Sequence, residues 1–301
     1  MKLIKPSFEI WEQPAGLEGV YKQIEKVGRV CYKSEDKITE DSAKPFVDRM
    51  IKSGHGAMLE HGTVYLQYEV VKGAINPLTK YYLNKYSKVK AKEGAIGETM
   101  RLFVTTNLRV LVENDWLKDL EYICEPTEHH ERRVTVHFVC DRGVSHEFVR
   151  HRVMSFAQES TRYCNYSKDK FGNELTFIIP CWLDVPTGHY AYWDGDWCDI
   201  DKMKIQLPEG EHKDIDAFLW TSNNAETHYT LLINSGRKPQ EARAVLPNSL
   251  KTELVVTGFT SDWNHFFDLR ARGTTGAPHP QAKELAEPLM KEFIARKYIN
   301  N

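Results

Sequence analysis

Hydrophobic residues recur along the chain with two different periods. Apolar and polar side chains alternate over 64–70 and again over 134–140, which predicts strands with one buried face. Apolar residues spaced three to four apart instead predict helices. These are expected at 19–54 around a short link, 97–111, 145–156, 215–234 and 250–271. Periodicity alone therefore indicates a mixed α+β fold.

Two segments interrupt this pattern. Residues 72–132 separate the two predicted strands and are expected to form an inserted hairpin with helices. Residues 181–212 are rich in Gly, Pro, Asp and Trp without a sustained period, which indicates a long loop or a second small insertion. With 301 residues, 41% of them apolar, the chain can form one large domain or two smaller ones.

Net charge, hydropathy and cysteine spacing argue against several classes of protein. A formal net charge of −2 gives no electrostatic case for broad nucleic-acid or membrane binding. No apolar run approaches the length of a membrane span, and the first residues contain no apolar signal segment. The six cysteines show neither CxxC pairs nor zinc spacing, so we expect reduced, mostly structural thiols in a cytoplasmic protein without a metal site.

One short stretch concentrates polar chemistry. Arg150, His151, Arg152 and Arg162 are interleaved with Ser155, Gln158 and Ser160, starting in the middle or at the end of a predicted helix. Consecutive helical side chains point in different directions, so the Arg-His-Arg triplet suits an extended ligand or separate partners. Arginine binds phosphate in a fork, and hydroxyls complete the shell. An exposed ion-pair network is an equally good interpretation of these residues taken alone.

The full pattern is more specific than the triplet. Arg150-His151-Arg152 followed by Ser160, with Ser155 between them and Arg162-Tyr163 after, resembles the signature of the flavin-dependent thymidylate synthases. The resemblance implies an α/β fold with a curved, mostly antiparallel sheet flanked by long helices. It implies one domain over 1–301 with insertions at about 72–132 and 181–212, in a homotetramer with shared active sites.

The resemblance also implies a reaction. The family methylates dUMP to dTMP with 5,10-methylenetetrahydrofolate as carbon donor and FAD, reduced by NADPH, as hydride carrier. A fixed cation on the uracil ring replaces a cysteine nucleophile, because a guanidinium can stabilise developing charge at N3 and O2 without losing a proton. The similarity assigns this catalytic role to Arg270. The alternative is a non-catalytic protein that binds nucleotides or nucleic acid through the Arg/Ser cluster.

Further passages of the family have counterparts that assign binding residues. A His followed by Glu-His before a strand matches His55, Glu60 and His61, and Arg243 lies in a passage that resembles the family's phosphate-binding one. The expected dUMP contacts are Glu147, Arg150, Gln158, Ser160, Arg162, Arg243 and Arg270. The expected FAD contacts are His55, Ala57, Glu60, Arg150, His151, Arg152, Gln158, Phe259 and His265.

Three of these positions depart from the family pattern. Ala57 replaces a hydroxyl residue, Phe259 replaces a frequent Asn, and Glu147 replaces a Gln that touches the nucleotide. Glu147 adds a negative charge close to an expected phosphate site. It must therefore either turn away from the ligand or pair with an arginine.

Overall fold

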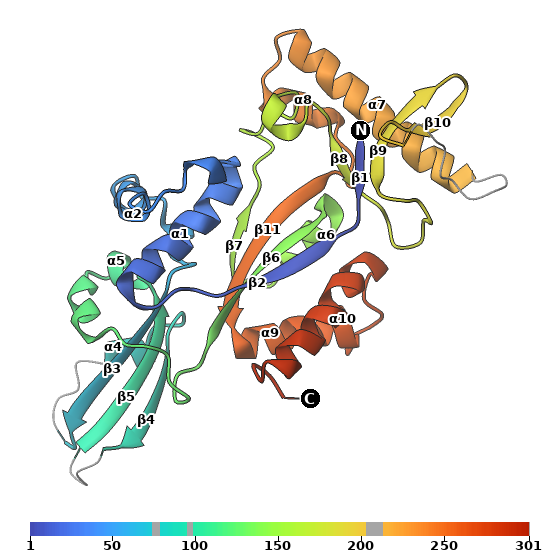
Figure 1. Ribbon diagram of the computed structural model, residues 1–301. Coiled ribbons are helices and arrows are strands. Elements are labelled where there is room, and N and C mark those ends of the chain that lie inside the picture. Colours follow the sequence, from blue (N-terminus) through green and yellow to red (C-terminus); the bar gives the residue numbers. More distant parts are fainter. Residues whose placement is uncertain (74–78, 95–98, 203–212, 301) are drawn as a thin grey trace.

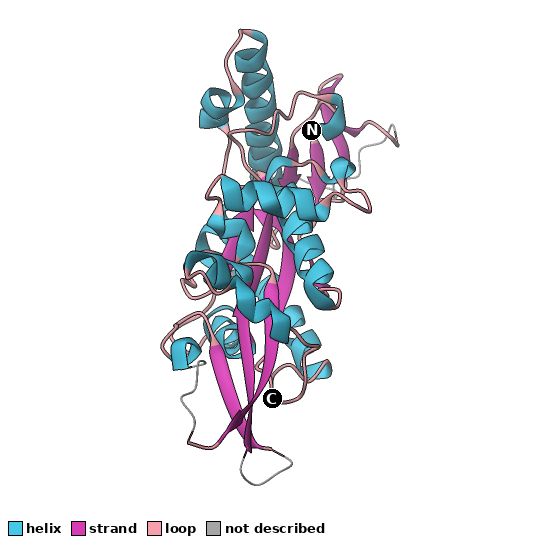
Figure 2. Cartoon of the chain, turned by 90° about the vertical axis from the view of Figure 1, so that its left-hand side faces the viewer, coloured by secondary structure: helices cyan, strands magenta, loops and turns pink. Residues whose placement is uncertain are grey.

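The computed structural model describes residues 1–73, 79–94, 99–202 and 213–300 of the chain. Their strands form three sheets, and the middle sheet is flanked by helices on both sides (Figure 1). A view turned by 90° shows an elongated molecule with one of the other two sheets near each end (Figure 2). The mixed α/β class with mostly antiparallel pairing is confirmed, although the strands form three sheets instead of one curved sheet.

The middle sheet carries the signature stretch. Its strands are antiparallel, in the order β2 (Ser7–Trp11), β6 (Arg133–Asp141), β11 (Lys251–Phe259) and β7 (Ser155–Gln158). β6 confirms the strand expected at 134–140. β7 is an edge strand, so the residues before and after it lie at the border of the sheet.

Residues 72–132, expected to be an insertion and called the insertion below, contribute two of the three strands of the second sheet. β5 (Thr99–Asn107) lies between β3 (Thr63–Val71) and β4 (Lys88–Glu93), and both pairings are antiparallel. β3 confirms the strand expected at 64–70. The helices of the insertion are α4 (Thr79–Tyr82), α5 (Leu108–Glu113) and the 3-10 helix η2 (Leu117–Tyr122). Residues 74–78 and 95–98 of the expected insertion lie outside the described residues.

The third sheet has the order β10 (Asp196–Asp199), β9 (Gly188–Trp193), β1 (Lys2–Ile4) and β8 (Thr176–Ile178), with β1 and β8 parallel. The long loop expected at 181–212 is therefore wrong for β9 and β10, which form a hairpin. The physical reason is that Tyr190 and Trp197 are buried in the cluster that also contains residues of α7 (Lys213–Asn234). Residues 203–212 lie outside the described part of the chain.

The remaining helices cover the sheets. They are α1 (Gly16–Tyr32), η1 (Glu35–Lys37), α2 (Ala43–Lys52), α3 (Gly56–Leu59), α6 (Arg142–Phe148), η3 (Asp169–Phe171), α8 (Pro239–Ala242), η4 (Arg243–Val245), α9 (Thr260–Phe267), the π-helical turn η5 (Asp268–Arg272) and α10 (Pro280–Ala295). α1, α2 and α7 confirm the helices expected over 19–54 and 215–234. Among the described helices, none combines the length and apolar character of a membrane span.

The middle sheet has a different core on each face. One face packs Val136, Phe138 and Val256 against Trp263 of α9 and Leu289 of α10. The opposite face, with Trp11, Ala157 and Val255, packs on Val27 and Val30 of α1. Earlier in the same helix, Val20 and Ile24 belong to the core of the β3-β5-β4 sheet. α1 is therefore shared by two hydrophobic cores.

Two expected helices are wrong in their first part, which forms a strand, and confirmed in their last part, which is helical. Residues 250–271 form β11 before α9 and η5, and 99–107 of the expected 97–111 helix form β5; Gly97 and Glu98 lie outside the described residues. Residues 252–259 of β11 and 102–107 of β5 are buried on both strand faces. Such a strand has no alternating polar face, so its apolar run imitates helical spacing.

The helix expected at 145–156 is also wrong. α6 begins earlier, where the Asp141 side chain accepts a hydrogen bond of 2.8 Å from the Val144 N–H, and it ends at Phe148. Val149 and Val153 are exposed, so the expected stripe is not a buried face. The Arg-His-Arg triplet consequently lies on a turn between α6 and the edge strand β7.

Candidate functional site

The turn 149–154 separates the three side chains of the triplet. Arg150 and Arg152 are exposed, whereas His151 is 7% exposed and packs against Phe266 of α9 with ring centroids 4.9 Å apart. The backbone N–H of Met154 donates to the His151 carbonyl at 3.0 Å, which closes the turn. His151 therefore anchors the turn and leaves the two arginines accessible to a ligand.

Arg270 lies beside this turn and is held by three contacts. Its Nη1 lies 2.5 Å from Oε2 of Glu147, and its Nη2 donates to the Glu147 carbonyl at 2.9 Å. Its Nε donates to Nε2 of His151 at 3.3 Å. Glu147 is thus not turned away but pairs with the arginine that the family resemblance marks as catalytic.

His151 is suited to accept this hydrogen bond. Burial, together with the positive charge of Arg270 and the neighbouring His265, lowers the pKa of His151 to about 4. The imidazole is therefore neutral near pH 7, with Nε2 free to accept and the proton on Nδ1. His265 is exposed and its ring centroid lies 5.9 Å from that of His151, so Glu147, His151, His265 and Arg270 form one group.

A second group lies beyond the other end of β7. Ser160 is tied to α1, because its backbone N–H donates to the Cys31 carbonyl at 3.0 Å. Arg162 and Arg243 are both exposed, and Nη1 of Arg243 donates to Oγ1 of Thr161 at 3.3 Å. Oγ of Ser160 accepts a hydrogen bond from the Arg162 backbone N–H at 3.3 Å, and Arg243 contacts the residue between them, so the three residues expected to bind phosphate belong to one group.

A third group surrounds a hollow of about 370 Å³. The segment 54–58, which carries His55 and the start of α3 with Ala57, forms one wall; Tyr32 and Arg109 lie on the others. The Tyr32 ring lies 5.2 Å from that of Tyr163, next to Arg162. Tyr32 therefore connects the hollow to the second group. Sequence reasoning missed both Tyr32 and Arg109, since neither lies in a recognised motif.

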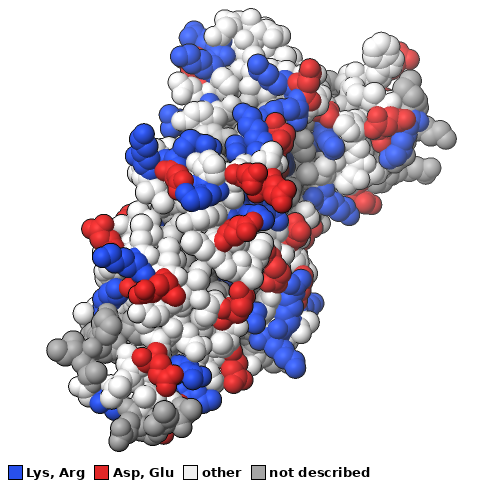
Figure 3. All heavy atoms as spheres, turned by 60° about the vertical axis from the view of Figure 1, so that its left-hand side comes forward, with Lys and Arg blue, Asp and Glu red and all other residues white. Residues whose placement is uncertain are grey.

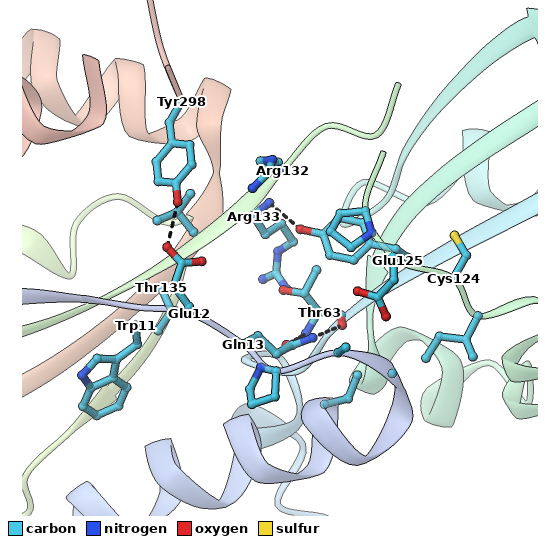
Figure 4. A pocket seen from close by; sticks show the side chains of 18 residues that line it. Trp11, Glu12, Gln13, Thr63, Cys124, Glu125, Arg132, Arg133, Thr135 and Tyr298 are labelled. Atoms are coloured by element: carbon cyan, nitrogen blue, oxygen red, sulfur yellow. Dashed lines mark hydrogen bonds between the residues drawn. The ribbon is translucent and has the colours of Figure 1, made fainter. Parts of the chain in front are cut away.

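Arg133 connects the loop before β3 to the signature stretch. Its Nη1 donates to the Glu60 carbonyl at 2.9 Å, and its Nη2 donates to Oγ of Ser155 at 3.3 Å. Figure 4 shows Arg133 and Thr63 together in a cavity of about 100 Å³ between the β2–α1 link and the insertion. Burial lowers the pKa of Arg133 to about 10, which leaves it charged at neutral pH.

The other predicted contacts have distinct surroundings. Glu60 itself forms an ion pair with Arg109, with 2.5 Å between Oε1 and Nη1. Gln158 donates from Nε2 to Oγ of Ser145 at 2.8 Å, on the α6 side of the sheet. Phe259 is buried, and the cations of Lys88 and Arg133 lie 5.6 and 5.5 Å from its ring centroid. Phe259 thus packs the insertion onto the middle sheet.

A buried charge network underlies the segment 158–162. Nζ of Lys251 lies 2.8 Å from Oε2 of Glu159 and 2.5 Å from Oε1 of Glu253, and Glu253 also binds Lys33 and His137. Although burial opposes it, the hydrogen bond from His137 and the charges of Lys251 and Lys33 hold the pKa of Glu253 far below its usual range. Sequence reasoning missed this network because it treated 250–271 as a helix.

Two of the buried thiols, those of Cys31 and Cys164, are poor nucleophiles. None of the six cysteines, all of which are described, forms a disulfide. Burial raises the pKa of Cys31 to about 11 and that of Cys164 to about 12. Since the thiolate is the reactive form, these two side chains are inert near neutral pH.

The surface around these groups is not uniformly basic. Figure 3 shows lysine and arginine side chains intermingled with acidic ones over the face that it presents. The described residues hold no cluster of three or more His, Cys, Asp or Glu that could bind a metal ion. The positive charge relevant to a ligand is therefore local, on Arg150, Arg152, Arg162, Arg243 and Arg270.

The three groups together have features that a flavin dinucleotide requires. The hollow beside His55 is within the size range of small-molecule sites, and the exposed ring of Tyr32 offers an aromatic surface. Exposed arginines at both ends of β7 can pair with phosphates. Arg152 and Ser160 are eight positions apart. Since a strand rises by about 3.3 Å per residue, they can lie up to about 26 Å from each other. The residues present therefore fit an extended, phosphate-bearing ligand with a flat ring.

Comparison with known proteins gives one family. The model of the family described as "Thymidylate synthase complementing protein" matches residues 120–296. A flavin-dependent thymidylate synthase from Pyrococcus furiosus is 31% identical over 160 residues, which cover 53% of this chain and 53% of the relative. One from Corynebacterium aurimucosum is 22% identical over 284 residues, covering 93% of this chain and 78% of the relative. The chain thus spans about half the length of the first relatives that it matches.

A solved structure is also similar to the chain. It is the UMP/dUMP methylase PolB from Streptomyces cacaoi bound with 5-Br dUMP, at 16% sequence identity and a TM-score of 0.44. The alignment covers 98% of this chain and 93% of that chain.

Proposed function

Since the chain belongs to the thymidylate synthase complementing protein family, we propose that it catalyses the reductive methylation of dUMP to dTMP. The carbon donor is 5,10-methylenetetrahydrofolate. FAD, reduced by NADPH, is the cofactor. Curated relatives carry the name flavin-dependent thymidylate synthase, which supports the flavin assignment.

The fixed position of Arg270 is the observation that carries the proposal. A guanidinium has five N–H groups, and the contacts to Glu147 and His151 use three of them. One N–H on each terminal nitrogen remains for a ligand. Two donors on one planar cation match the O2 and N3 edge of uracil, and their charge stabilises negative charge that develops there. Arg270 is the proposed catalytic residue.

The second group supplies the nucleotide's anchor. Arg162 and Arg243 are exposed, Arg243 contacts Thr161 between Ser160 and Arg162, and the two guanidinium groups would hold the 5′-phosphate of dUMP. Between the two ends of the site, Gln158 and Arg150 would contact the nucleotide. The buried network of Lys251, Glu159 and Glu253 fixes the backbone from which these side chains project.

The cofactor would occupy the remaining surface. His55, Ala57 and Glu60 on the loop before β3 would border the isoalloxazine ring, while Arg150 and Arg152 would pair with the diphosphate. His151 on the turn, His265 on α9 and Phe259 at the end of β11 would also contribute to the cofactor site. When bound, the flavin supplies the hydride chemistry, and the protein orients the three ligands. We also propose a homotetramer with shared sites, which light scattering after size-exclusion chromatography tests.

NADPH-dependent release of tritium from 5-tritiated dUMP tests the function, because methylation at C5 expels the hydrogen there. We expect release only when FAD, NADPH and 5,10-methylenetetrahydrofolate are all present. Arg270→Ala should abolish release while flavin binding persists. Arg272→Ala is the matched control, since Arg272 lies in the same π-helical turn but pairs with Asp268 at 2.9 Å.

Two results would refute the proposal. One is the absence of tritium release from folded, flavin-loaded protein. The other is full release by Arg270→Ala. Nucleotide binding without turnover would instead favour the non-catalytic alternative.

A further inference from the structure

Glu147 gives Arg270 a charged partner that the sequence pattern of the family does not provide. The ion pair joins Oε2 of Glu147 to Nη1 of Arg270 at 2.5 Å, and the two residues are 123 positions apart in sequence. The Arg270 side chain is 17% exposed and that of Glu147 is 29% exposed. The pair therefore lies at the border between protein and solvent, where a ligand can reach the guanidinium.

Two different kinds of contact hold Arg270 at this place. The Glu147 carbonyl and the His151 ring are neutral acceptors, and they orient the guanidinium without changing its charge. Only the Glu147 carboxylate carries a compensating charge. Asp268, the acidic residue of the same π-helical turn, pairs with Arg272 instead. The nearest basic neighbour on α9 is His265.

We propose that Glu147 is the counter-ion of Arg270, a positioning residue that partly neutralises the guanidinium and so limits how strongly the site stabilises an ionised nucleobase. This inference rests on the proposed function, in which Arg270 faces the uracil ring. An ionised uracil places negative charge on N3 and O2, next to the remaining N–H groups of Arg270. The Glu147 carboxylate would then lie about one guanidinium width from that charge, and the two like charges would repel each other.

The size of the effect follows from Coulomb's law. Two like charges about 6 Å apart change an equilibrium constant about three- to ten-fold when the effective dielectric constant is about 40 to 80. Glu147→Gln removes the charge but retains a side-chain oxygen for Nη1, and the backbone carbonyl is unaffected. The substitution therefore separates charge compensation from orientation.

The experiment measures the N3 ionisation of a bound probe, 5-fluoro-dUMP, by ¹⁹F NMR as a function of pH with FAD-loaded protein. The fluorine lowers the N3 pKa of the base toward neutral pH, so both protonation states are accessible. We expect Glu147→Gln to increase the acid dissociation constant of the bound N3–H about three- to ten-fold relative to wild type. A purely structural role of Glu147 would not move this constant.

Two variants serve as controls. Glu147→Asp keeps the charge and should leave the N3 ionisation constant within about two-fold of wild type, even if turnover falls. Asp268→Asn removes a carboxylate from the neighbouring Arg272 and should leave it unchanged. If Glu147→Gln binds the probe normally but the acid dissociation constant of the bound N3–H is unchanged or smaller, the inference about Glu147 is wrong. The proposed function is not affected by that result. Failure of the wild type to bind the probe would overturn the proposed function and the inference together.

Discussion

Replacing Lys251 with Met should destabilise the protein strongly, because it removes the cation from a buried charge network. Nζ of Lys251 bridges Glu159 and Glu253. Glu253 would keep Lys33 and His137, whereas Glu159, whose side chain is fully buried, would keep only the Tyr166 hydroxyl at 2.8 Å among the described side chains. Breaking a buried ion pair by removing one partner costs about 3 to 5 kcal/mol. We expect Lys251→Met to lower the free energy of unfolding by about that amount.

Urea denaturation at neutral pH measures this difference, with Lys44→Met as the control. Lys44 forms an ion pair with Asp48 at 2.8 Å, but both side chains are more than half exposed. Exposed ion pairs contribute little to stability, so the control should change the free energy of unfolding little. A loss in Lys251→Met no larger than that in Lys44→Met would refute the assignment of a tightly coupled buried network.

The pH dependence provides an independent check. The folded-state pKa of Glu253 is depressed, so its contribution is present above the unfolded pKa of about 4.3 and is lost as pH falls toward the folded value. Lys251→Met removes one of the charges that cause this depression and so weakens it. The stability difference between wild type and Lys251→Met should therefore shrink as pH falls below about 5. A difference independent of pH would contradict this account.

Three further substitutions test other parts of the site. Cys164→Ala should retain tritium release, because burial raises the pKa of this thiol to about 12. Loss of release from the folded variant would instead support a mechanism with a cysteine nucleophile. Arg133→Met should weaken FAD binding about ten-fold or more by uncoupling Glu60 from Ser155, as titration of flavin fluorescence measures; unchanged affinity would contradict that link. Gly273→Ala should cost about 1 to 2 kcal/mol in thermal or urea unfolding, because φ at this residue is +72°, and an unchanged stability would refute that strain.

Sequence periodicity located the strands with one polar face and missed those without one. β3 and β6 each retain partly exposed positions that alternate with buried ones. In β11, consecutive residues Leu254, Val255 and Val256 are all buried, because the sheet has a core on each face. A strand covered on both sides carries no polarity pattern, so only its partners in space identify it.

The family signature predicted the candidate site residues but not which of them form ion pairs with each other. The triplet and the loop before β3 were recognisable as short local patterns. By contrast, Glu147 and Arg270 are 123 positions apart, and Lys33 and Glu253 are 220 apart. Contacts of this range depend on how the edge strand and α9 pack, which no local pattern encodes. The sequence therefore left two alternatives for Glu147, turning away from the ligand or pairing with an arginine, and the structure shows the pair with Arg270.

The sharing of α1 between two cores has a consequence for cooperative unfolding. Val20 and Ile24 belong to the core of the insertion sheet, and Val27 and Val30 to that of the middle sheet. A helix propagates order along its hydrogen-bonded backbone, so loosening one half exposes apolar surface in both cores. We therefore expect amide hydrogen exchange in 72–132 and in the middle sheet to be coupled through the seventeen residues of α1. We expect residues 72–132 to unfold cooperatively with the middle sheet and not as a separate unit.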